Sequence, residues 1–280
     1  MLPATSRRNV PAARPIIRWA GSKRRLLPKL LACVPQAYDR YFEPFAGSAC
    51  LFLALRPRKA ILGDIIEELI HTYSVAREQP GEVATALFRM PRRSSYYYTL
   101  RAKVSVDLDP VARAARFIYL NRNCFNGIYR TNRSNRFNVP WGTRTGRNPS
   151  LTEFLNWATA FRGAELRCGD FEDCLSDIHK GDFIYLDPPY SCSKRPSSGE
   201  YTYDCFGDRD FQRFVELLRH AEKLEAILLL SFADDPRLRD SFPEWHYRSV
   251  LARRDVASLA QYRLVESEVI ASNKPLPAEL

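Results

Sequence analysis

Short apolar runs alternate with amphipathic stretches near both ends of the chain. Runs rich in β-branched and aromatic residues predict strands, and apolar positions spaced three to four residues apart predict helices. The predicted elements are strands at 59–63, 182–186 and 225–232, a strand, tight turn and helix over 41–55, an amphipathic helix over 208–223, and an antiparallel pair of strands at 245–251 and 266–272. Strands that alternate with helices in this way are typical of an α/β fold.

The middle of the chain, 71–167, interrupts this alternation. It contains two helical patterns, at 83–90 and 109–122, followed by 123–142, a polar stretch rich in Asn, Arg and aromatic residues. This order predicts an α/β sheet with an inserted, mainly helical region that carries a β-hairpin. The expected boundaries are a flexible basic arm at 1–15, the sheet-forming part at 16–70 and 165–280, and the insertion at 71–164.

The composition is that of a globular protein, with 45% hydrophobic and 26% charged residues among 280. No apolar run is long enough to span a bilayer, so we expect no membrane segment. The 42 Lys and Arg outnumber the 32 Asp and Glu, which gives a net charge of +10 and a pI near 9.4. Such a basic chain favours a polyanionic partner, although charge alone does not separate DNA from RNA.

Cysteine and histidine are the residues that would indicate disulfides or a metal site. The seven cysteines are an odd number without a C-x-x-C pair, which disfavours a disulfide framework and a zinc site and favours a reducing cytoplasm. The four histidines do not pair at the spacing of metal ligands. We therefore expect no metal cofactor.

The clearest chemical signal is the tetrapeptide Asp187-Pro188-Pro189-Tyr190, which ends the predicted strand 182–186. Proline cannot donate to a sheet ladder, so the strand stops and delivers a carboxylate, a prolyl carbonyl and a ring at its carboxyl end. Open α/β sheets bind ligands at that edge. The two acceptors match the two hydrogens of an exocyclic amino group, and Tyr190 can lie against the ring that carries it. The alternative is an Asp-Pro turn with a core tyrosine behind it.

A second group of residues favours a cofactor that contains a nucleoside. Small residues at 46–49 let a ligand approach the backbone where a helix begins. Asp64 ends the second predicted strand, where an acid typically holds ribose hydroxyls. Upstream, Gly21-Ser22 predicts a turn into a short helix that Ser22 caps, which places Lys23 to meet a carboxylate or phosphate.

Five motifs follow one another between residues 18 and 190, within 17–273, the part of the chain that carries a family resemblance. They are Arg18-Trp19-Ala20-Gly21-Ser22-Lys23, Phe42-Glu43-Pro44-Phe45-Ala46-Gly47-Ser48, Gly63-Asp64, Gly169-Asp170-Phe171 and Asp187-Pro188-Pro189-Tyr190. In this order they resemble the motifs of the Dam-like DNA adenine-N6 methyltransferases, the alpha group of the D12 class. The resemblance implies a Rossmann-like methyltransferase sheet, with an S-adenosylmethionine (AdoMet)-binding catalytic domain at 16–70 and 165–280 and a DNA target-recognition domain at 71–164.

The resemblance also implies which residues bind AdoMet and perform the transfer. Lys23 is the candidate partner of the methionyl carboxylate, and Asp64 that of the ribose. The implied cofactor-binding residues are Trp19, Ala20, Gly21, Lys23, Glu43, Phe45, Gly47, Asp64, Asp170 and Phe171. The implied catalytic residues are Asp187, Pro188, Pro189 and Tyr190.

The stretch 123–142 resembles the family's target-recognition region. Arginines suit phosphate contacts, Asn and Arg suit base edges, and an apolar side chain on the turn can wedge between bases once the target base is flipped. The implied DNA contacts are Arg122, Phe125, Asn126, Ile128, Arg130, Asn132, Arg133 and, from a lid expected at 191–207, Tyr201. Arg130 would read a base, and the pattern favours GATC without separating it from related GAT-containing sites. The alternative is a surface hairpin whose aromatic residues only anchor it to the core.

Two positions depart from the family pattern. Ala49 stands where many members have glycine, and Ile66 stands where many have asparagine. We expect the extra methyl of Ala49 to crowd the cofactor, and neither residue to touch the transferred methyl group.

The expected activity is that of a site-specific adenine DNA methyltransferase, which moves a methyl group from AdoMet to N6 of a flipped adenine in a short duplex site. The alternatives are an RNA adenine or a cytosine-N4 methyltransferase, whose acceptors are also exocyclic amines, and a catalytically silent AdoMet-binding regulator of DNA. A dehydrogenase is disfavoured because Gly-x-Gly-x-x-Gly is absent. We expect double-stranded DNA as partner, a cytoplasmic monomer and a restriction-modification context, with a cognate restriction endonuclease left open.

Overall fold

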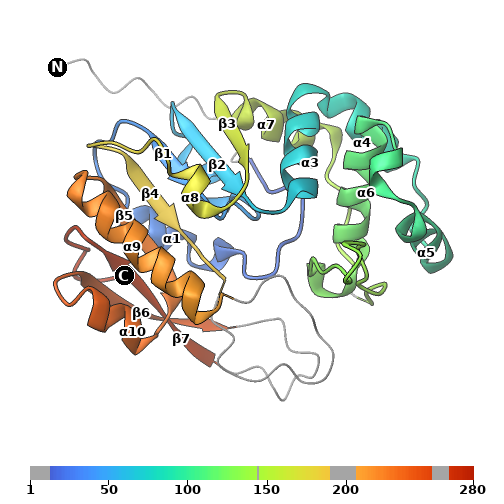
Figure 1. Cartoon of the computed structure of the whole chain (residues 1–280). Coiled ribbons are helices and arrows are strands. Elements are labelled where there is room, and N and C mark those ends of the chain that lie inside the picture. The colour runs from blue at the N-terminus through green and yellow to red at the C-terminus, as the bar shows by residue number, and fades with distance from the viewer. Residues whose placement is uncertain (1–12, 144, 190–205, 254–264) are drawn as a thin grey trace.

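One seven-stranded sheet organises the structure, a computed structural model that describes residues 13–143, 145–189, 206–253 and 265–280 (Figure 1). The strands are β1 (Tyr41–Glu43), β2 (Ala60–Asp64), β3 (Ala164–Cys168), β4 (Phe183–Leu186), β5 (Ile227–Ala233), β6 (His246–Arg253) and β7 (Val265–Ser272). They lie in the order β3-β2-β1-β4-β5-β7-β6, with β7 antiparallel to both neighbours and the other pairs parallel. All of the predicted strands are confirmed, and β3 is a further strand.

The central strands β1, β2 and β4 are mostly apolar and are buried along their whole length, including the acids Glu43 and Asp64 at the ends of β1 and β2. Successive side chains point to opposite faces of the sheet. Tyr41 and Phe183 therefore pack in one core, and Phe42 and Ile184 pack in the other. The helices with buried residues in the first core include α1 (Leu27–Ala32) and α2 (Cys50–Leu55), and those in the second are α8 (Phe171–Cys174), α9 (Asp208–Lys223) and α10 (Pro236–Ser241).

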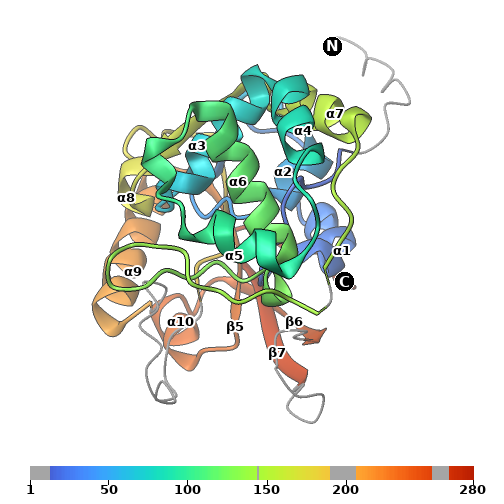
Figure 2. The same cartoon turned by 90° about the vertical axis from the view of Figure 1, so that its right-hand side faces the viewer.

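The chain between β2 and β3 is mainly helical. Its helices are α3 (Glu67–Glu78), α4 (Pro80–Phe88), α5 (Ser94–Ala102), α6 (Pro110–Asn123) and α7 (Leu151–Phe161). The two predicted helical patterns correspond to α4 and α6, and Asp109 caps α6 by accepting the Ala112 N–H at 3.0 Å. Helix α6 packs against α3, α4 and α5 (Figure 2). Helices therefore lie between β2 and β3, and an inserted target-recognition domain at 71–164 stays a prediction.

The stretch after α6 folds back on itself as the predicted hairpin. Its two arms meet at antiparallel bridges between Cys124 and Trp141 and between Thr131 and Phe137. Phe137 and Trp141 are half-buried and pack on the hydrophobic core, so they anchor the hairpin to it. Among the described residues, no helix combines the length and apolar character that crossing a bilayer requires.

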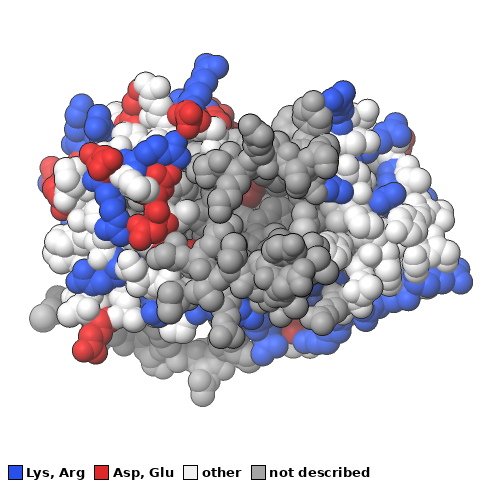
Figure 3. All heavy atoms as spheres, turned by 90° about the horizontal axis from the view of Figure 1, so that it is seen from below, with Lys and Arg blue, Asp and Glu red and all other residues white. Residues whose placement is uncertain are grey.

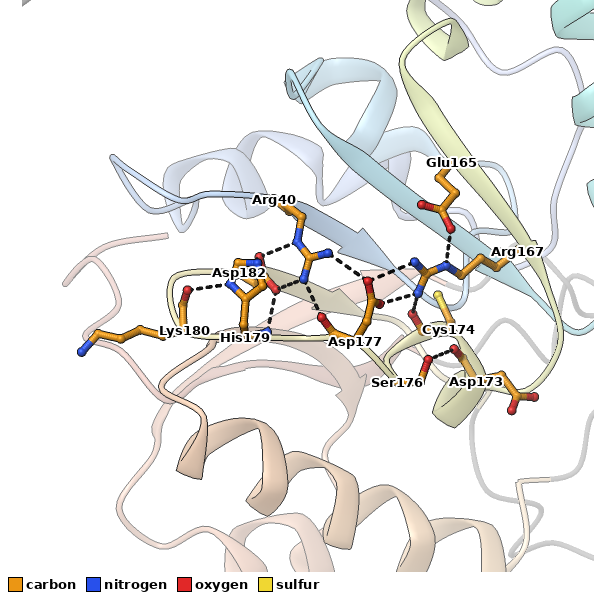
Figure 4. Close-up of polar contacts among 10 residues, drawn as sticks. All are labelled: Arg40, Glu165, Arg167, Asp173, Cys174, Ser176, Asp177, His179, Lys180 and Asp182. Carbon is orange, nitrogen blue, oxygen red and sulfur yellow. Dashed lines mark hydrogen bonds and ion pairs between the residues drawn. The ribbon is translucent and has the colours of Figure 1, made fainter.

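A network of ion pairs ties β1, β3 and β4 together near the start of β1 and β4 (Figure 4). Arg40 contacts both carboxylate oxygens of the fully buried Asp182, at 3.0 and 2.7 Å. It also contacts Asp177, which pairs with Arg167 of β3 at 2.6 Å. These pairs lower the pKa of Asp177 to about 2.

Replacing Arg40 with Met is expected to destabilise the protein by about 3–5 kcal/mol, because the buried charge of Asp182 loses the guanidinium that bonds to both of its oxygens. A matched control is Lys180→Met, which removes an ion pair to Glu225 whose side chains are 74% and 64% exposed. The control should cost less than about 1 kcal/mol. Urea unfolding measures both, and equal losses would contradict the account.

Candidate active site

The carboxyl ends of the parallel strands bring acidic residues to one edge of the sheet. Glu43 ends β1, Asp64 ends β2, and Asp187 follows β4. Asp170 follows β3 and caps α8. From β1 the sheet continues through β2 and β3 on one side, and the chain then crosses to β4 and β5 on the other side. The point between β1 and β4 is therefore a topological switch point, where open α/β sheets bind ligands. Glu43 and Asp187 lie directly on it.

Asp187 is held by side chains from two other elements. Lys23 Nζ lies 2.6 Å from its Oδ1, and the Ser231 hydroxyl of β5 donates to the same oxygen at 3.2 Å. Lys23 is only 6% exposed, whereas the Asp187 side chain keeps 20% of its surface exposed. Pro188 is buried and Pro189 is exposed, and the predicted Tyr190 lies outside the described residues. The carboxylate is thus fixed on one side and open on the other.

Burial raises the pKa of Asp187, and the positive charge of Lys23 opposes this shift. Burial also raises the pKa of Glu43, to about 8, and the nearby charge of Asp187 adds to the effect. The Tyr41 hydroxyl donates to Glu43 Oε2 at 2.7 Å. Since neighbouring carboxylates disfavour each other's charge, Glu43 holds a proton at neutral pH beside an Asp187 that is paired with Lys23.

Glu43 should make the stability of the cofactor-free protein depend on pH. Its pKa is about 8 when folded and near 4.5 when unfolded, so its contribution to stability is lost as the pH rises from about 4.5 to 8. The neutral variant Glu43→Gln should therefore unfold like the wild type at pH 5 and be more stable at pH 8.5, on the order of a few kcal/mol. Thermal unfolding at the two pH values measures this, and parallel pH dependences would refute it.

Phe45 and Phe171 form an aromatic pair, with ring centroids 5.6 Å apart, beside the ends of β1 and β3. Asp170 caps α8 by accepting the Glu172 N–H at 3.2 Å. It also pairs with Arg213 of α9 at 3.0 Å, and the Arg213 guanidinium lies over the Phe171 ring. The structure therefore brings three of the predicted cofactor-binding residues together.

Asp64 holds the turn after β1. Its carboxylate accepts the backbone N–H groups of Gly47 and Ile66, both at 3.0 Å. Gly47 has φ +45°, and a Cβ there would lie 2.8 Å from the Trp19 ring, so glycine is required. Ile66 makes this contact through its backbone N–H, so the contact does not depend on the side chain that departs from asparagine.

Ala49, the other departure, has φ 51° at the start of α2. A left-handed conformation is strained for alanine and free for glycine, which is a physical reason for glycine at this position. The Ala49 side chain is buried, and crowding of the cofactor stays a prediction.

The turn before α1 brings Lys23 to Asp187. Gly21 has φ +81°, and the chain continues through the short 3-10 helix η1 (Lys23–Arg25) into α1. The prediction that Ser22 caps this helix is wrong, because its side chain makes no capping bond and lies 2.9 Å from the Ser48 hydroxyl instead. The half-buried Trp19 and Ala20 precede the turn, and Trp19 stacks with Tyr129 of the hairpin.

These residues fit AdoMet. Ribose hydroxyls, an adenine ring and a methionyl carboxylate require an acid, an apolar aromatic surface and a cation, respectively. Asp64, the pair of Phe45 and Phe171, and Lys23 are of these kinds and lie along one sheet edge. The individual contacts that we predicted stay predictions.

Most of the predicted DNA contacts lie on the hairpin, and several of their side chains already bond within the chain. Arg130 donates to Asn138 at 2.8 Å, and Asn132 accepts the N–H groups of Ser134 and Arg136. Arg122 donates to the backbone carbonyl of Ile16 at 3.0 Å. The other predicted contacts are half-buried at Phe125, Asn126 and Ile128, exposed at Arg133, and outside the described residues at Tyr201.

The net charge of the chain comes from the insertion. Residues 71–164 contain 15 Lys and Arg against 5 Asp and Glu, whereas the rest contains 27 of each kind. Lys and Arg gather at the right-hand end of the molecule in Figure 3, the end that carries α5 and α6 in Figure 1, and acidic residues are interspersed with them at the other end. A polyanion is therefore attracted to the insertion.

Sequence reasoning missed Ser231 and Arg213. Ser231 is the one polar residue in the buried run of β5, a signal that could have identified it. Arg213 lies on a predicted helix among other charged residues and gives no such signal. Among the described residues, the five cysteines are free, and no cluster of three His, Cys, Asp or Glu could hold a metal ion.

Comparison with known proteins gives the family. The model of the D12 class N6 adenine-specific DNA methyltransferases matches residues 19–255. A type II methyltransferase of Lactococcus lactis subsp. cremoris, M1.LlaDCHI, is 32% identical over 276 residues, covering 93% of this chain and 95% of the relative. The DNA adenine methylase of Haemophilus influenzae is 28% identical over 265 residues, covering 92% and 93%. The chain therefore belongs to the D12 class of N6 adenine-specific DNA methyltransferases, and its cofactor is S-adenosylmethionine.

Proposed function

We propose that this chain methylates N6 of adenine within a short duplex DNA site, as a site-specific adenine DNA methyltransferase. Asp187 is the catalytic residue, and its carboxylate accepts a hydrogen bond from the adenine amine. The observation that carries the proposal is the placement of Asp187 at the switch point, with Oδ1 held by Lys23 and Ser231. A carboxylate oriented in this way before the substrate arrives stabilises charge without having to reorganise.

The tetrapeptide Asp187-Pro188-Pro189-Tyr190 would bind the adenine and orient its amino group. Asp187 and the Pro188 carbonyl would accept the two amine hydrogens of a flipped adenine, orient its nitrogen lone pair and stabilise the positive charge that grows on the nitrogen. Tyr190 would stack on the base, and Pro189 keeps the turn rigid. When bound, AdoMet supplies an electrophilic methyl group, so no covalent intermediate on the protein is needed. The amine proton can leave after the nitrogen has become cationic.

The cofactor would lie along the edge formed by β1, β2 and β3. Lys23 would pair with the methionyl carboxylate, Asp64 with the ribose, and Asp170 and Phe171 with the adenine. Phe45, which packs on Phe171, would complete the apolar side of the site. Trp19 and Gly47 would shape this edge, because the Trp19 indole ring packs directly against the turn at Gly47.

Duplex DNA would lie along the insertion. The excess of arginine there suits phosphate contacts, and Trp19 stacking on Tyr129 connects the hairpin to the cofactor segment. A base extruded next to the hairpin would then enter the edge where Asp187 lies, and Phe125 or Ile128 could fill the gap in the stack. The resemblance of the hairpin to the family pattern supports GATC as the site.

Methylation mapping tests this function. The enzyme is incubated with labelled AdoMet and either unmethylated plasmid DNA or RNA, and the modified positions are mapped. The proposal expects label in DNA at one short sequence, with GATC as the first candidate. Label in RNA alone would support the RNA methyltransferase, and AdoMet binding without any transfer would support the silent regulator.

Arg130→Ala is expected to relax recognition at a single base pair and to cost about 1–3 kcal/mol of discrimination there. The exposed Arg133 or Arg136 on the same hairpin provides the control, since loss of a phosphate contact weakens binding to all sequences alike. Methylation rates on a set of singly substituted duplexes distinguish the two effects. If Arg130→Ala lowered the methylation rate equally on all of the duplexes, Arg130 would not read a base.

We propose a monomer that works in the cytoplasm, the compartment that the cysteine pattern favours. The relative from Lactococcus is named as a type II methyltransferase, which supports restriction-modification as one context and a cognate endonuclease as one partner.

A further inference from the structure

Ser231 is a buried polar side chain at the centre of the sheet, outside the five motifs of the sequence. It lies on β5, has no exposed surface and is flanked by the buried residues Leu230 and Phe232. A hydroxyl in such a position costs free energy unless it is hydrogen-bonded. Its Oγ lies 2.8 Å from the Tyr185 hydroxyl and donates to Asp187 Oδ1 at 3.2 Å.

The direction of these hydrogen bonds follows from the donors that are present. An ionised carboxylate only accepts, so the single Ser231 proton points to Asp187. The Ser231 oxygen must then accept from Tyr185, whose hydroxyl is the donor. Tyr185, Ser231 and Asp187 therefore form a chain with one orientation, which ends at Oδ1.

The bonds that the described residues make to Asp187 converge on that oxygen. Lys23 Nζ lies 2.6 Å from Oδ1, the atom that also accepts from Ser231. Two donors from different elements fix the plane of the carboxylate and leave Oδ2 for a substrate.

We propose that Ser231 is a positioning residue for methyl transfer, and that its hydroxyl, supported by Tyr185, holds Oδ1 of Asp187 so that Oδ2 faces the exocyclic amine. The proposal rests on the proposed role of Asp187. It adds two residues from the interior of the sheet to the machinery of the reaction.

The hydrogen bonds from Tyr185 to Ser231 and from Ser231 to Asp187 orient the carboxylate and do not carry away the amine proton. Tyr185 is 1% exposed and packs in the core, and burial keeps the pKa of its hydroxyl well above the usual value. A proton passed from Asp187 through Ser231 would end on a phenol without access to water. Geometry is therefore the contribution that these hydroxyls make.

Ser231→Ala, Tyr185→Phe and the double variant test the proposal by kcat, KM for DNA and Kd for AdoMet. We expect kcat to fall about 10- to 100-fold in Ser231→Ala and less in Tyr185→Phe, because a small misplacement of a reacting group is costly. Kd for AdoMet should not change. The double variant should resemble Ser231→Ala, since Tyr185 acts through Ser231. The control is Ser272→Ala, which removes a buried hydroxyl of β7 that accepts the Lys274 N–H, and should leave kcat unchanged.

The pH profile separates positioning from a general loss of packing. The groups that act on the charge of Asp187 are Lys23, Glu43, Cys50, Tyr185 and Glu268, and all of them remain in Ser231→Ala. Loss of a hydrogen bond to the ionised carboxylate should move the acidic limb of kcat to higher pH, and Ser231→Thr, which keeps a hydroxyl, should restore it.

Two results would overturn the proposal. One is a Ser231→Ala enzyme with the kcat of the wild type, and the other is a fall in kcat without a shift of the acidic limb. Tyr185→Phe, which removes a single oxygen, keeps the test valid if Ser231→Ala does not fold. A wild-type enzyme that methylates no DNA would instead refute the proposed function, so the two failures are distinct.

Discussion

Asp187→Ala is expected to lower the rate of methyl transfer by at least about 10³-fold, because it removes the carboxylate that orients the adenine amine in a preorganised site. The variant should still bind AdoMet. The variant also frees Lys23 from its 2.6 Å ion pair. If Lys23 binds the methionyl carboxylate, its release should leave the affinity for AdoMet equal to that of the wild type or higher. Single-turnover transfer and calorimetric titration measure the two quantities.

Asp187→Asn is the matched control for shape. An amide keeps the size of the side chain but replaces one oxygen, a hydrogen-bond acceptor, with an NH₂ donor. That donor would face another donor, either the adenine amine or the Lys23 ammonium, and could not bond to it. We expect it to be nearly as inactive as Asp187→Ala. Turnover close to that of the wild type in either variant would remove Asp187 from the mechanism.

Lys23→Met is expected to weaken AdoMet binding by about 10- to 100-fold, since a charge-assisted hydrogen bond contributes about 1.5–3 kcal/mol. The variant also removes the cation that opposes the raised pKa of Asp187. Transfer at saturating AdoMet should therefore require a higher pH than in the wild type. Titration with AdoMet and a pH profile of kcat separate the effect on binding from the effect on Asp187.

Lys29→Met provides the control for this loss of charge. Lys29 lies on the neighbouring helix α1, and its Nζ donates to the Leu280 carbonyl at 2.9 Å, away from Asp187. It should bind AdoMet like the wild type. An unchanged Kd in Lys23→Met as well would show that Lys23 does not bind the methionyl carboxylate.

The parts of the fold that the sequence predicts well are those with an unambiguous hydrophobic pattern. The helix expected at 208–223 spans those residues, and Phe211, Phe214 and Leu218 are buried as one face. The central parallel strands β1, β2 and β4 are mostly apolar because both of their faces are covered. In contrast, β3 lies at the sheet edge with Glu165 and Arg167 partly in solvent, so its pattern is too polar to indicate a strand.

The site shows the same division between local and long-range information. The tetrapeptide and the strand that ends in Asp64 are local patterns, and their places at the sheet edge follow from strand direction. The pair of Lys23 and Asp187 joins residues far apart in the sequence, and only the folded sheet brings them together. Ser22 was misassigned for a related reason, since a neighbouring turn offers its hydroxyl the partner Ser48.

The most direct test of the central claim is mass spectrometry of the nucleosides from unmethylated plasmid DNA treated with AdoMet and either the wild type or Asp187→Ala. The account predicts N6-methyladenine with the wild type and none with the variant, although both bind AdoMet. N4-methylcytosine as the product, or equal amounts of N6-methyladenine from the two proteins, would contradict it.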